Sequence, residues 1–575
     1  MAQINPTVGD VEGNAQKILS YVTQAHLCYR ADMVIFPELV ITGYPPEDLL
    51  FREDFLNQVD SSIDWLKNEL AERVPNIHVV IGAPAREQGR LFNAALVLND
   101  GKILHRYFKQ KLPNYQVFDE CRYFESGEGY QSANVGIFKL NGINFGLSVC
   151  EDIWHEETVT KAVNSGVECI ISINASPYHV GKQSQRIKHV IHLAQKHNVS
   201  IIYTNMVGGQ DELVFDGASF AVNPNIPKTT ERLVANANAF KEQLHPIKLT
   251  RTDFSSHTTN QTSPLIVTSE IRPHLNTPAS IYSALVLGLK DYVNKSGFNS
   301  VILGLSGGID SALTLAIAVD ALGQDKVEAV MMPYDYTSQI SKDDAQAQAL
   351  KLGVRYRVLP IHQPFTGFMA ELKNEPEFKH AQSAFDMTEQ NLQARCRGVM
   401  LMALSNKKGS LVLTTGNKSE IAVGYCTLYG DMVGGFNPLK DVPKTLVYKL
   451  SEYRNTISPA IPERVITRPP SAELAPDQKD TDSLPPYERL DEIIKLYVDQ
   501  DASPLSIIDK GFDPSEVEQV IRLIDRNEYK RQQAVIGTRI SEKGFGRDRR
   551  YPVVKSSINW SLQKKILKLS EFRSI

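Results

Sequence analysis

The segment Gly304–Ser311, which reads Gly-Leu-Ser-Gly-Gly-Ile-Asp-Ser, has residue types suited to phosphate binding. It follows the apolar run 301–303 and opens into a helical pattern of apolar residues. Glycines let a backbone approach a ligand closely, and the N–H groups at a helix start attract anions. The segment lacks the lysine of a Walker loop, and Asp310 instead offers a carboxylate for magnesium. We therefore expect a nucleotide site with chemistry at the α-phosphate; the alternative is a strand-to-helix turn that binds nothing.

Three further residues, Glu38, Lys109 and Cys150, each follow an apolar run that predicts a strand. Open α/β folds gather their sites at the carboxyl ends of strands, so these residues can converge although they are far apart in sequence. A thiolate nucleophile needs a base and a positive neighbour. Glu38 can be the base, and Lys109 can stabilise the anion that forms when the thiolate attacks an amide carbon. Taken singly, each residue also fits a core, capping or solvated position.

Short apolar runs separated by amphipathic stretches predict the elements that position these residues. The first half contains six such runs and reads as a layered α/β domain. A second α/β unit starts near Ile281 and continues through residues 327–332 and 411–415. The stretch 235–278 between them is rich in Asn, Thr, Ser and Pro. We expect a first domain at residues 1–245, a linker at 246–278 and a second domain at 279–575.

The composition is that of a globular protein with sizeable cores, because 42% of the 575 residues are hydrophobic and 22% are charged. The formal net charge of −4 gives no basic field to attract nucleic acid or an anionic membrane, so we expect neither as a partner. Six cysteines without a CxxC pair indicate neither a disulfide framework nor a zinc site. With no apolar run long enough for a membrane span, we expect a cytoplasmic protein.

The local contexts of these residues resemble two known families. The phosphate-loop segment resembles the signature of the N-type ATP pyrophosphatases. The contexts Phe36-Pro-Glu-Leu39, Tyr107–Pro113 and Val149-Cys-Glu-Asp-Ile-Trp154 resemble the nitrilase and amidase superfamily. The stretches 112–120 and 174–178 are similar to its glutamine-amidase branch. By this resemblance Tyr115, Ser176 and Lys182 would hold glutamine, whereas ordinary loop hydrogen bonding is the alternative interpretation.

Over nearly its full length the chain is similar to the bacterial glutamine-dependent NAD synthetases. Seven ordered stretches carry the resemblance: Leu305–Ser311, Asn391–Arg397, Thr415-Gly-Asn-Lys-Ser-Glu420, Lys440–Thr445, Ser471–Leu474, Asp482–Tyr487 and Lys530–Gln533. The implied fold is a nitrilase-like α-β-β-α sandwich followed by a Rossmann-like doubly wound parallel sheet of the adenine nucleotide alpha hydrolase type.

The same resemblance assigns residues to each substrate. The residues expected to contact ATP are Gly304, Leu305, Ser306, Gly307, Gly308, Ile309, Asp310, Ser311, Thr415, Lys444 and Ser471. Those expected at the deamido-NAD site are Asn391, Arg395, Glu420 and Lys530. Asp310 and Glu420 can together supply the carboxylates that Mg²⁺ favours. The alternatives are a helix cap for Thr415 and a solvated helix face for Asn391 and Arg395. Leu428 stands where a substrate-binding lysine is expected, so no role is assigned there.

The implied reaction is the ATP-dependent amidation of deamido-NAD through an acyl-adenylate, with ammonia released from glutamine at Cys150. Its products are NAD, AMP, diphosphate and glutamate, and ammonia is expected to pass between the two domains. The family is commonly oligomeric, so a homo-oligomer is expected. One alternative is an enzyme of the same loop class that acts on another acceptor, such as a base or tRNA. A non-catalytic ligand sensor is the other.

Overall fold

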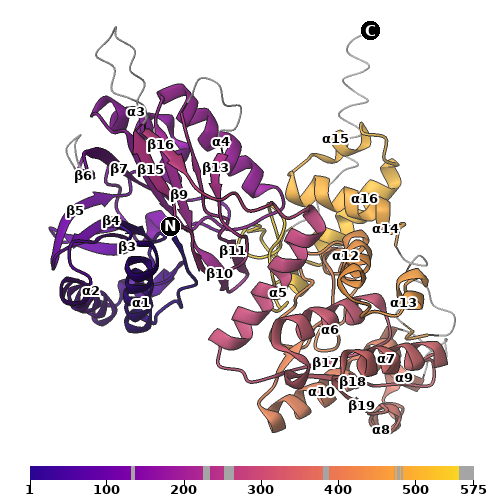
Figure 1. Ribbon diagram of the computed structural model, residues 1–575. Coiled ribbons are helices and arrows are strands. Elements are labelled where there is room, and N and C mark those ends of the chain that lie inside the picture. Colours follow the sequence, from indigo (N-terminus) through magenta and orange to yellow (C-terminus); the bar gives the residue numbers. More distant parts are fainter. Residues whose placement is uncertain are drawn as a thin grey trace, which may run out of the picture. The chain divides into compact units, whose positions relative to one another are not determined.

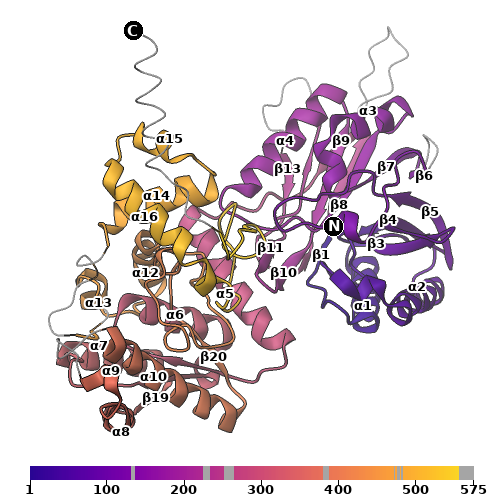
Figure 2. The same ribbon diagram turned by 180° about the vertical axis from the view of Figure 1, so that it is seen from behind.

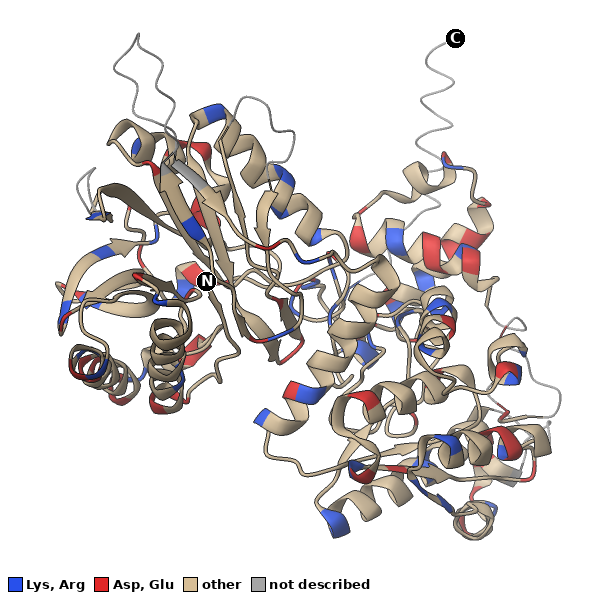
Figure 3. Ribbon diagram, viewed as in Figure 1, with Lys and Arg blue, Asp and Glu red and all other residues tan. Residues whose placement is uncertain are grey.

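The computed structural model describes residues 1–130, 136–224, 233–251, 265–379, 387–471, 473–475, 480 and 484–555. The chain divides into two compact units, Met1–Leu287 and Gly288–Ile575, and helix α5 (Thr277–Lys295) contains the boundary. Basic and acidic residues are interspersed over the elements of each unit (Figure 3). None of the helices in the described ranges combines the length and the apolar character that crossing a bilayer requires.

The first unit is built on two sheets. One sheet has the strand order β2 (Met33–Ile35), β3 (His78–Glu87), β4 (Arg90–Asn99) and β5 (Lys102–Phe108). The other has the order β13 (Leu233–Asn236), β12 (Phe220–Val222), β9 (Ser200–Asn205), β8 (Cys169–Asn174), β7 (Ile143–Val149) and β6 (Ile137–Leu140). Its central strands β7, β8 and β9 are parallel, and so are β2 and β3.

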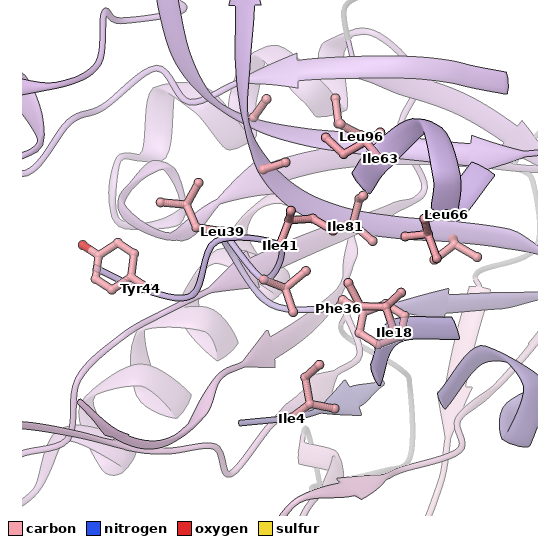
Figure 4. Close-up of a cluster of buried hydrophobic side chains, with 14 of the residues drawn as sticks. Ile4, Ile18, Phe36, Leu39, Ile41, Tyr44, Ile63, Leu66, Ile81 and Leu96 are labelled. Atoms are coloured by element: carbon pink, nitrogen blue, oxygen red, sulfur yellow. The ribbon is translucent and has the colours of Figure 1, made fainter. Parts of the chain in front are cut away.

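Side chains alternate in direction along the strands, so each sheet packs against the other sheet on one face and against helices on the other. Val79 and Ile81 pack in a core with α1 (Val11–Tyr29) and α2 (Glu53–Arg73), whereas Val80 between them packs toward the second sheet. In the same way Ile171 faces the first sheet and Ile170 faces α3 (Glu156–Asn164) and α4 (Lys182–His197). Successive side chains of a strand point to opposite faces, so both sheets are buried on both sides. Figures 1 and 2 show the helix–sheet–sheet–helix layers, and Figure 4 shows the outer core around Phe36 and Leu66.

The stretch expected to be a linker contains strands. Within it, β15 (Lys248–Arg251) pairs with β16 (Leu265–Thr268); just before it, β14 (Gln243–Leu244) pairs with the short first strand β1 (Ala2–Gln3). Val267 N–H donates to the buried Asn223 Oδ1 at 2.8 Å, which ties this stretch to the first unit. The structure therefore gives more order here than the polar composition suggests. β-Branched residues such as Val267 are enriched in strands.

The second unit contains a parallel sheet with the order β19 (Arg355–Val358), β18 (Val327–Met331), β17 (Val301–Gly304) and β20 (Leu411–Leu413). β17 comes first in the chain, and later strands add on one side and then on the other. The sheet is thus doubly wound, with its switch point between β17 and β20. In such sheets ligands bind outside the carboxyl ends of the strands at this point.

Helices complete the second unit, and α10 (Met387–Lys408) packs on β17 and β20 while α6 (Ile309–Leu322) packs with α12 (Lys444–Ile457). The other helices of the sheet region are α7 (Gln339–Leu352), α8 (His362–Leu372), α9 (Pro376–Lys379) and α13 (Glu463–Thr467). A separate apolar cluster joins α11 (Lys418–Val423) to α14 (Tyr487–Ile494), α15 (Pro504–Ile508) and α16 (Pro514–Arg526), with α17 (Glu528–Arg531) following.

Candidate active sites

Cys150 lies at the end of β7, where the strand turns into a single helical turn, Cys150–Trp154. Its φ angle of 45° is in the left-handed region, which side-chain-bearing residues rarely adopt. Such strained residues cluster at functional sites. Cys150 is buried and directly follows the last residue of β7, as the sequence predicts, and its role as a nucleophile stays a prediction.

The Lys109 ammonium is held between two carboxylates. Its Nζ donates to Glu38 Oε1 and to Glu120 Oε1, each at 2.8 Å, and all three residues are buried. Asn93 Nδ2 donates to Glu38 Oε1 at 2.8 Å, and Ala175 N–H donates to Glu38 Oε2 at 2.9 Å. Glu38 is therefore fixed by three donors, and Lys109 and Glu38 meet as the sequence predicts.

Charge and burial set the protonation of this cluster. Burial, together with the negative charge of Glu38, raises the pKa of the Cys150 thiol well above its usual value. Burial alone would lower the pKa of Lys109, but the charges of Glu120 and Glu38 outweigh it and raise that pKa. The cluster thus keeps a neutral thiol beside an ammonium ion, and Cys150 needs a base to take its proton during attack.

Two carboxylates of this site were not predicted. Glu120 shares Lys109 with Glu38 and accepts from Tyr44 Oη at 2.9 Å, and burial raises its pKa to about 7. Asp152 accepts from the N–H groups of Gln110 and Lys111, at 3.0 and 2.7 Å, and so ties the Lys109 strand end to the Cys150 turn. Both lie inside stretches that carry the family resemblance, 112–120 and 149–154, but no role was assigned to them, because an acid taken singly looks like a solvated residue.

The three residues expected to bind glutamine surround this cluster. Tyr115 Oη donates to Glu151 Oε2 at 3.0 Å, next to Cys150 in the chain. Ser176 follows Ala175, whose N–H binds Glu38. The Lys182 ammonium lies 4.6 Å from the ring centroid of Trp154, at the end of the Cys150 turn. The structure thus brings Tyr115, Ser176 and Lys182 to the elements that carry the catalytic candidates.

In the second unit a cavity of about 300 Å³ opens at the switch point of the sheet. The predicted ATP residues Gly304–Ser306, Gly308–Ser311, Thr415, Lys444 and Ser471 line it, as does Glu420. Ser311 Oγ donates to Gly308 O at 2.9 Å and accepts from Ser306 N–H at 3.2 Å, which fixes the loop. Gly307, which is also predicted to contact ATP, is not among the residues that line the cavity. Its φ angle is 85°, and a Cβ atom there would lie 2.3 Å from Ser341 O, so this position requires glycine.

Two carboxylates and a lysine face one another in this cavity. Lys444 Nζ donates to Asp310 Oδ2 and lies 3.5 Å from Glu420 Oε1, while Asn417 Nδ2 donates to Asp310 Oδ1 at 2.9 Å. Burial and the charge of Asp310 raise the pKa of Glu420 to about 8. Two mutually repelling carboxylates at a phosphate loop suit a divalent cation. Within the described ranges, no group of three or more acidic, His or Cys side chains is arranged to hold a metal.

Comparisons with known proteins cover both sites. A carbon-nitrogen hydrolase family model matches residues 1–245, and an NAD synthase family model matches residues 281–534. The glutamine-dependent NAD(+) synthetase of Acinetobacter baylyi is 50% identical over 557 residues, covering 96% of this chain and 97% of that protein. That of Aquifex aeolicus is 43% identical, covering 96% and 98%. The chain belongs to the glutamine-dependent NAD(+) synthetases.

Solved structures agree with this family assignment. The glutamine-dependent NAD+ synthetase from Acinetobacter baumannii, solved in complex with adenosine diphosphate, has a TM-score of 0.72 and 46% identity, and the match covers 96% of this chain and 97% of that one. The synthetase from Cytophaga hutchinsonii shares the fold, with a TM-score of 0.80 at 21% identity. The carbon-nitrogen hydrolase match contains Glu38, Lys109 and Cys150, and the NAD synthase match contains the phosphate loop.

Three of the residues expected to contact deamido-NAD do not line the cavity but hold the loop after α11. Thr427 Oγ1 donates to Asn391 Oδ1 at 2.8 Å, and Arg395 Nε donates to Leu428 O at 3.2 Å. Lys530 Nζ donates to the carbonyls of Gly424 and Cys426, each at 2.8 Å. The structure brings them together on the 424–428 segment, and their contact with substrate stays a prediction.

The cavity also contains charged residues that the sequence reasoning did not single out. Arg397 lines it, and burial lowers the pKa of its guanidinium to about 10. Asp431 lines it too, and burial raises the pKa of this carboxyl to about 6. Arg397 lies two residues beyond Arg395 on α10 and ends the stretch Asn391–Arg397 that carries the family resemblance, which is the sequence signal for it.

Proposed function

We propose that this chain makes NAD from deamido-NAD, ATP and glutamine, with glutamine hydrolysed at Cys150 and the amide formed at the phosphate loop. One observation carries the proposal. A single chain holds a buried Glu38–Lys109–Cys150 site and a phosphate-loop cavity, and glutamine-dependent NAD(+) synthetases match it over 96% of its length. The activity is that of a ligase that takes its nitrogen from glutamine.

In the first unit Glu38 takes the proton of the Cys150 thiol as the sulfur attacks the amide carbon of glutamine. Lys109 stabilises the negative charge of the tetrahedral state. Glu38 then returns the proton to the leaving nitrogen, so ammonia departs and a glutamyl thioester remains. Water attacks the thioester and gives its proton to Glu38, and glutamate leaves as the thiol reforms. Three donors to the Glu38 carboxylate support this role, because they hold it at one position.

The residues around this site supply contacts for glutamine itself. Lys182 offers a positive charge for the α-carboxylate, and its ammonium lies over the face of the Trp154 ring, 4.6 Å from the ring centroid. Glu151, which accepts from Tyr115 Oη, offers a negative charge for the α-ammonium group. Ser176 adds a hydroxyl in the residue that follows Ala175, whose N–H donates to Glu38. Opposite charges for the two ends of an amino acid are consistent with glutamine as the substrate.

In the second unit the backbone N–H groups of residues 304–311 bind the phosphates of ATP, and Lys444 and Thr415 contribute side-chain donors. The carboxylate of deamido-NAD attacks the α-phosphate and pyrophosphate leaves; ammonia then attacks the acyl-adenylate and AMP leaves. Asp310 and Glu420 would hold Mg²⁺, which supplies positive charge for the phosphate oxygens when bound. Asn391, Arg395, Glu420 and Lys530 would bind deamido-NAD, directly or through the 424–428 segment.

Assembly as a homo-oligomer and a cytoplasmic location stay predictions. The family resemblance favours the first, and light scattering of the purified protein measures it. All six cysteines carry free thiols in the structure, which is consistent with a reducing compartment.

The test is NAD formation by the purified chain from deamido-NAD, ATP and Mg²⁺, with glutamine or ammonium as the nitrogen donor. We expect NAD, AMP and pyrophosphate in equal amounts, and glutamate in addition when glutamine is the donor. Glutamate release without NAD from either donor would keep the amidase and require another acceptor. AMP without NAD would show adenylation of a different carboxylate.

A further inference from the structure

Arg186 is a fully buried arginine in the first unit, on α4, one helical turn after Lys182. Residues four apart lie on the same face of a helix, so Arg186 and Lys182 share a face. A buried guanidinium is costly unless it is paired and hydrogen-bonded. Its partners therefore show what it holds in place.

The guanidinium binds the loop that carries Ser176. Nε donates to Ser176 Oγ at 3.1 Å, and Nη2 donates to Ser176 O at 2.7 Å and to Pro177 O at 3.0 Å. Nη1 donates to both oxygens of the buried Asp216 on β11 (Leu213–Asp216), at 2.7 and 2.9 Å. Every nitrogen of the fork is engaged by protein oxygens, so Arg186 acts on the loop rather than on a ligand.

Further hydrogen bonds fix the same loop and connect it to Glu38, the proposed base. Asn205 accepts from Ser176 N–H at 2.9 Å, and Tyr178 N–H donates to Val214 O at 2.7 Å. Ala175, the residue before Ser176, donates its N–H to Glu38 Oε2 at 2.9 Å. The Ala175–Tyr178 loop is thus fixed at each residue, and it touches both the base and a predicted glutamine contact.

We propose that Arg186 is a positioning residue for glutamine: it locks the Ala175–Tyr178 loop to α4 and so sets the places of Ser176, Lys182 and Glu38 relative to one another. This inference rests on the proposed function, because it takes Ser176 and Lys182 as glutamine contacts. Asp216 serves as the counterion that keeps the guanidinium in its orientation.

The test compares Arg186→Lys, Arg186→Gln and the double variant Arg186→Gln/Asp216→Asn in the intact chain. Lysine keeps the charge but lacks the planar fork, and the double variant removes both buried charges together. Lys188→Gln, at an exposed position on the same helix, is the matched control. NAD formation is measured against glutamine concentration and, separately, against ammonium concentration.

We expect kcat/KM for glutamine to fall about 10- to 100-fold in Arg186→Lys, mainly through KM, since small displacements of positioning groups have effects of this size. Ammonium-driven synthesis stays within about twofold of the wild type. The double variant folds and keeps the high KM for glutamine. An unchanged KM in Arg186→Lys would overturn the inference, and so would a parallel loss of ammonium-driven synthesis in every Arg186 variant, which would mean a role in folding alone.

Ser176→Ala and Lys182→Met in the same assay separate the inference from the proposed function. If neither raises the KM for glutamine, the proposed glutamine contacts are wrong. If both raise it while Arg186→Lys does not, the contacts stand and only the positioning role of Arg186 fails.

Discussion

At the scale of single residues, the site proposed for glutamine is organised by one ammonium ion between two buried carboxylates. The positive charge of Lys109 offsets the negative charges of Glu38 and Glu120. Burial and the charge of Glu38 raise the pKa of Cys150, so its side chain stays a neutral thiol. A nucleophile in this state reacts only when a base removes its proton in the transition state. Glu38 is therefore expected to govern the rate of glutamine hydrolysis more than the binding of glutamine.

Glu38→Gln tests this role. We expect glutamine hydrolysis to fall by about 10²- to 10⁴-fold, the usual contribution of a general base, with little change in KM. Ammonium-driven NAD synthesis continues at the wild-type rate, and the exposed Glu72→Gln serves as the control. Retention of more than about a tenth of the hydrolysis rate would assign the base to another group.

Asp152 is expected to make the stability of the fold depend on pH. Burial raises the pKa of its carboxyl from 3.8 to about 6, so the native state holds this proton more tightly than the unfolded chain does. The free energy of unfolding therefore falls as the pH rises from about 4 to 6, by about 3 kcal/mol from this group.

Asp152→Asn removes that slope, because the amide does not titrate. In urea unfolding from pH 4 to 8, we expect the variant to gain stability relative to the wild type up to about pH 6 and to show a constant difference above it. Parallel curves over the whole range would contradict the assignment.

At the scale of elements, a buried lysine joins segments around the phosphate-loop cavity. Lys418, at the start of α11, lies 2.9 Å from both Asp441 Oδ1 and Asp499 Oδ1. Asp441 also accepts from the N–H groups of Ile540 and Ser541, at 2.8 and 2.7 Å. The two ion pairs of Lys418, together with the hydrogen bonds of Asp441, thus link α11, which carries Glu420, to the segment before Lys444 and to the loop at residues 540–541.

Lys418→Met leaves the buried Asp441 and the partly buried Asp499 without their cation. We expect a loss of about 3–5 kcal/mol in the unfolding of the second unit and a rise in the KM for ATP, while glutamine hydrolysis is unchanged. Lys407→Met, at an exposed position on α10, is the control for charge removal. Equal stability of Lys418→Met and the wild type would mean that the pair adds nothing to the fold.

The sequence predicted the elements that carry a regular pattern and missed contacts that have none. Glu38, Lys109 and Cys150 follow apolar runs, so their strand ends and their convergence were predictable. Glu120 and Arg186 were not, because each gains its role from partners brought near only by the fold. The 246–278 stretch is predicted to be a linker because it is rich in Asn, Thr, Ser and Pro. The pairing of β15 with β16 and the hydrogen bond from Val267 to Asn223 order part of it, and composition does not signal such contacts.

At the scale of the whole molecule, each unit contains a complete site of its own. The cavity residues are all in the second unit, and the Cys150 cluster is all in the first. The two half-reactions should therefore respond separately to substitutions, even though one chain performs both.

Lys444→Met tests the second half. Its ammonium offsets Asp310 and Glu420 in the cavity, and removing it should lower NAD formation from either donor by about 10²-fold or more. Glutamate release from glutamine is expected to persist, measured in the same reaction. Loss of NAD from glutamine alone would place Lys444 outside the synthetase chemistry.

The account depends most directly on Cys150 supplying nitrogen for amide formation elsewhere in the chain. The measurement is NAD formation by Cys150→Ala, beside the wild type, from deamido-NAD and ATP with glutamine or with ammonium. We predict that the variant makes no NAD from glutamine and makes it from ammonium at the wild-type rate. Glutamine-driven NAD formation by the variant, or loss of both activities in a folded variant, would contradict the two-site account.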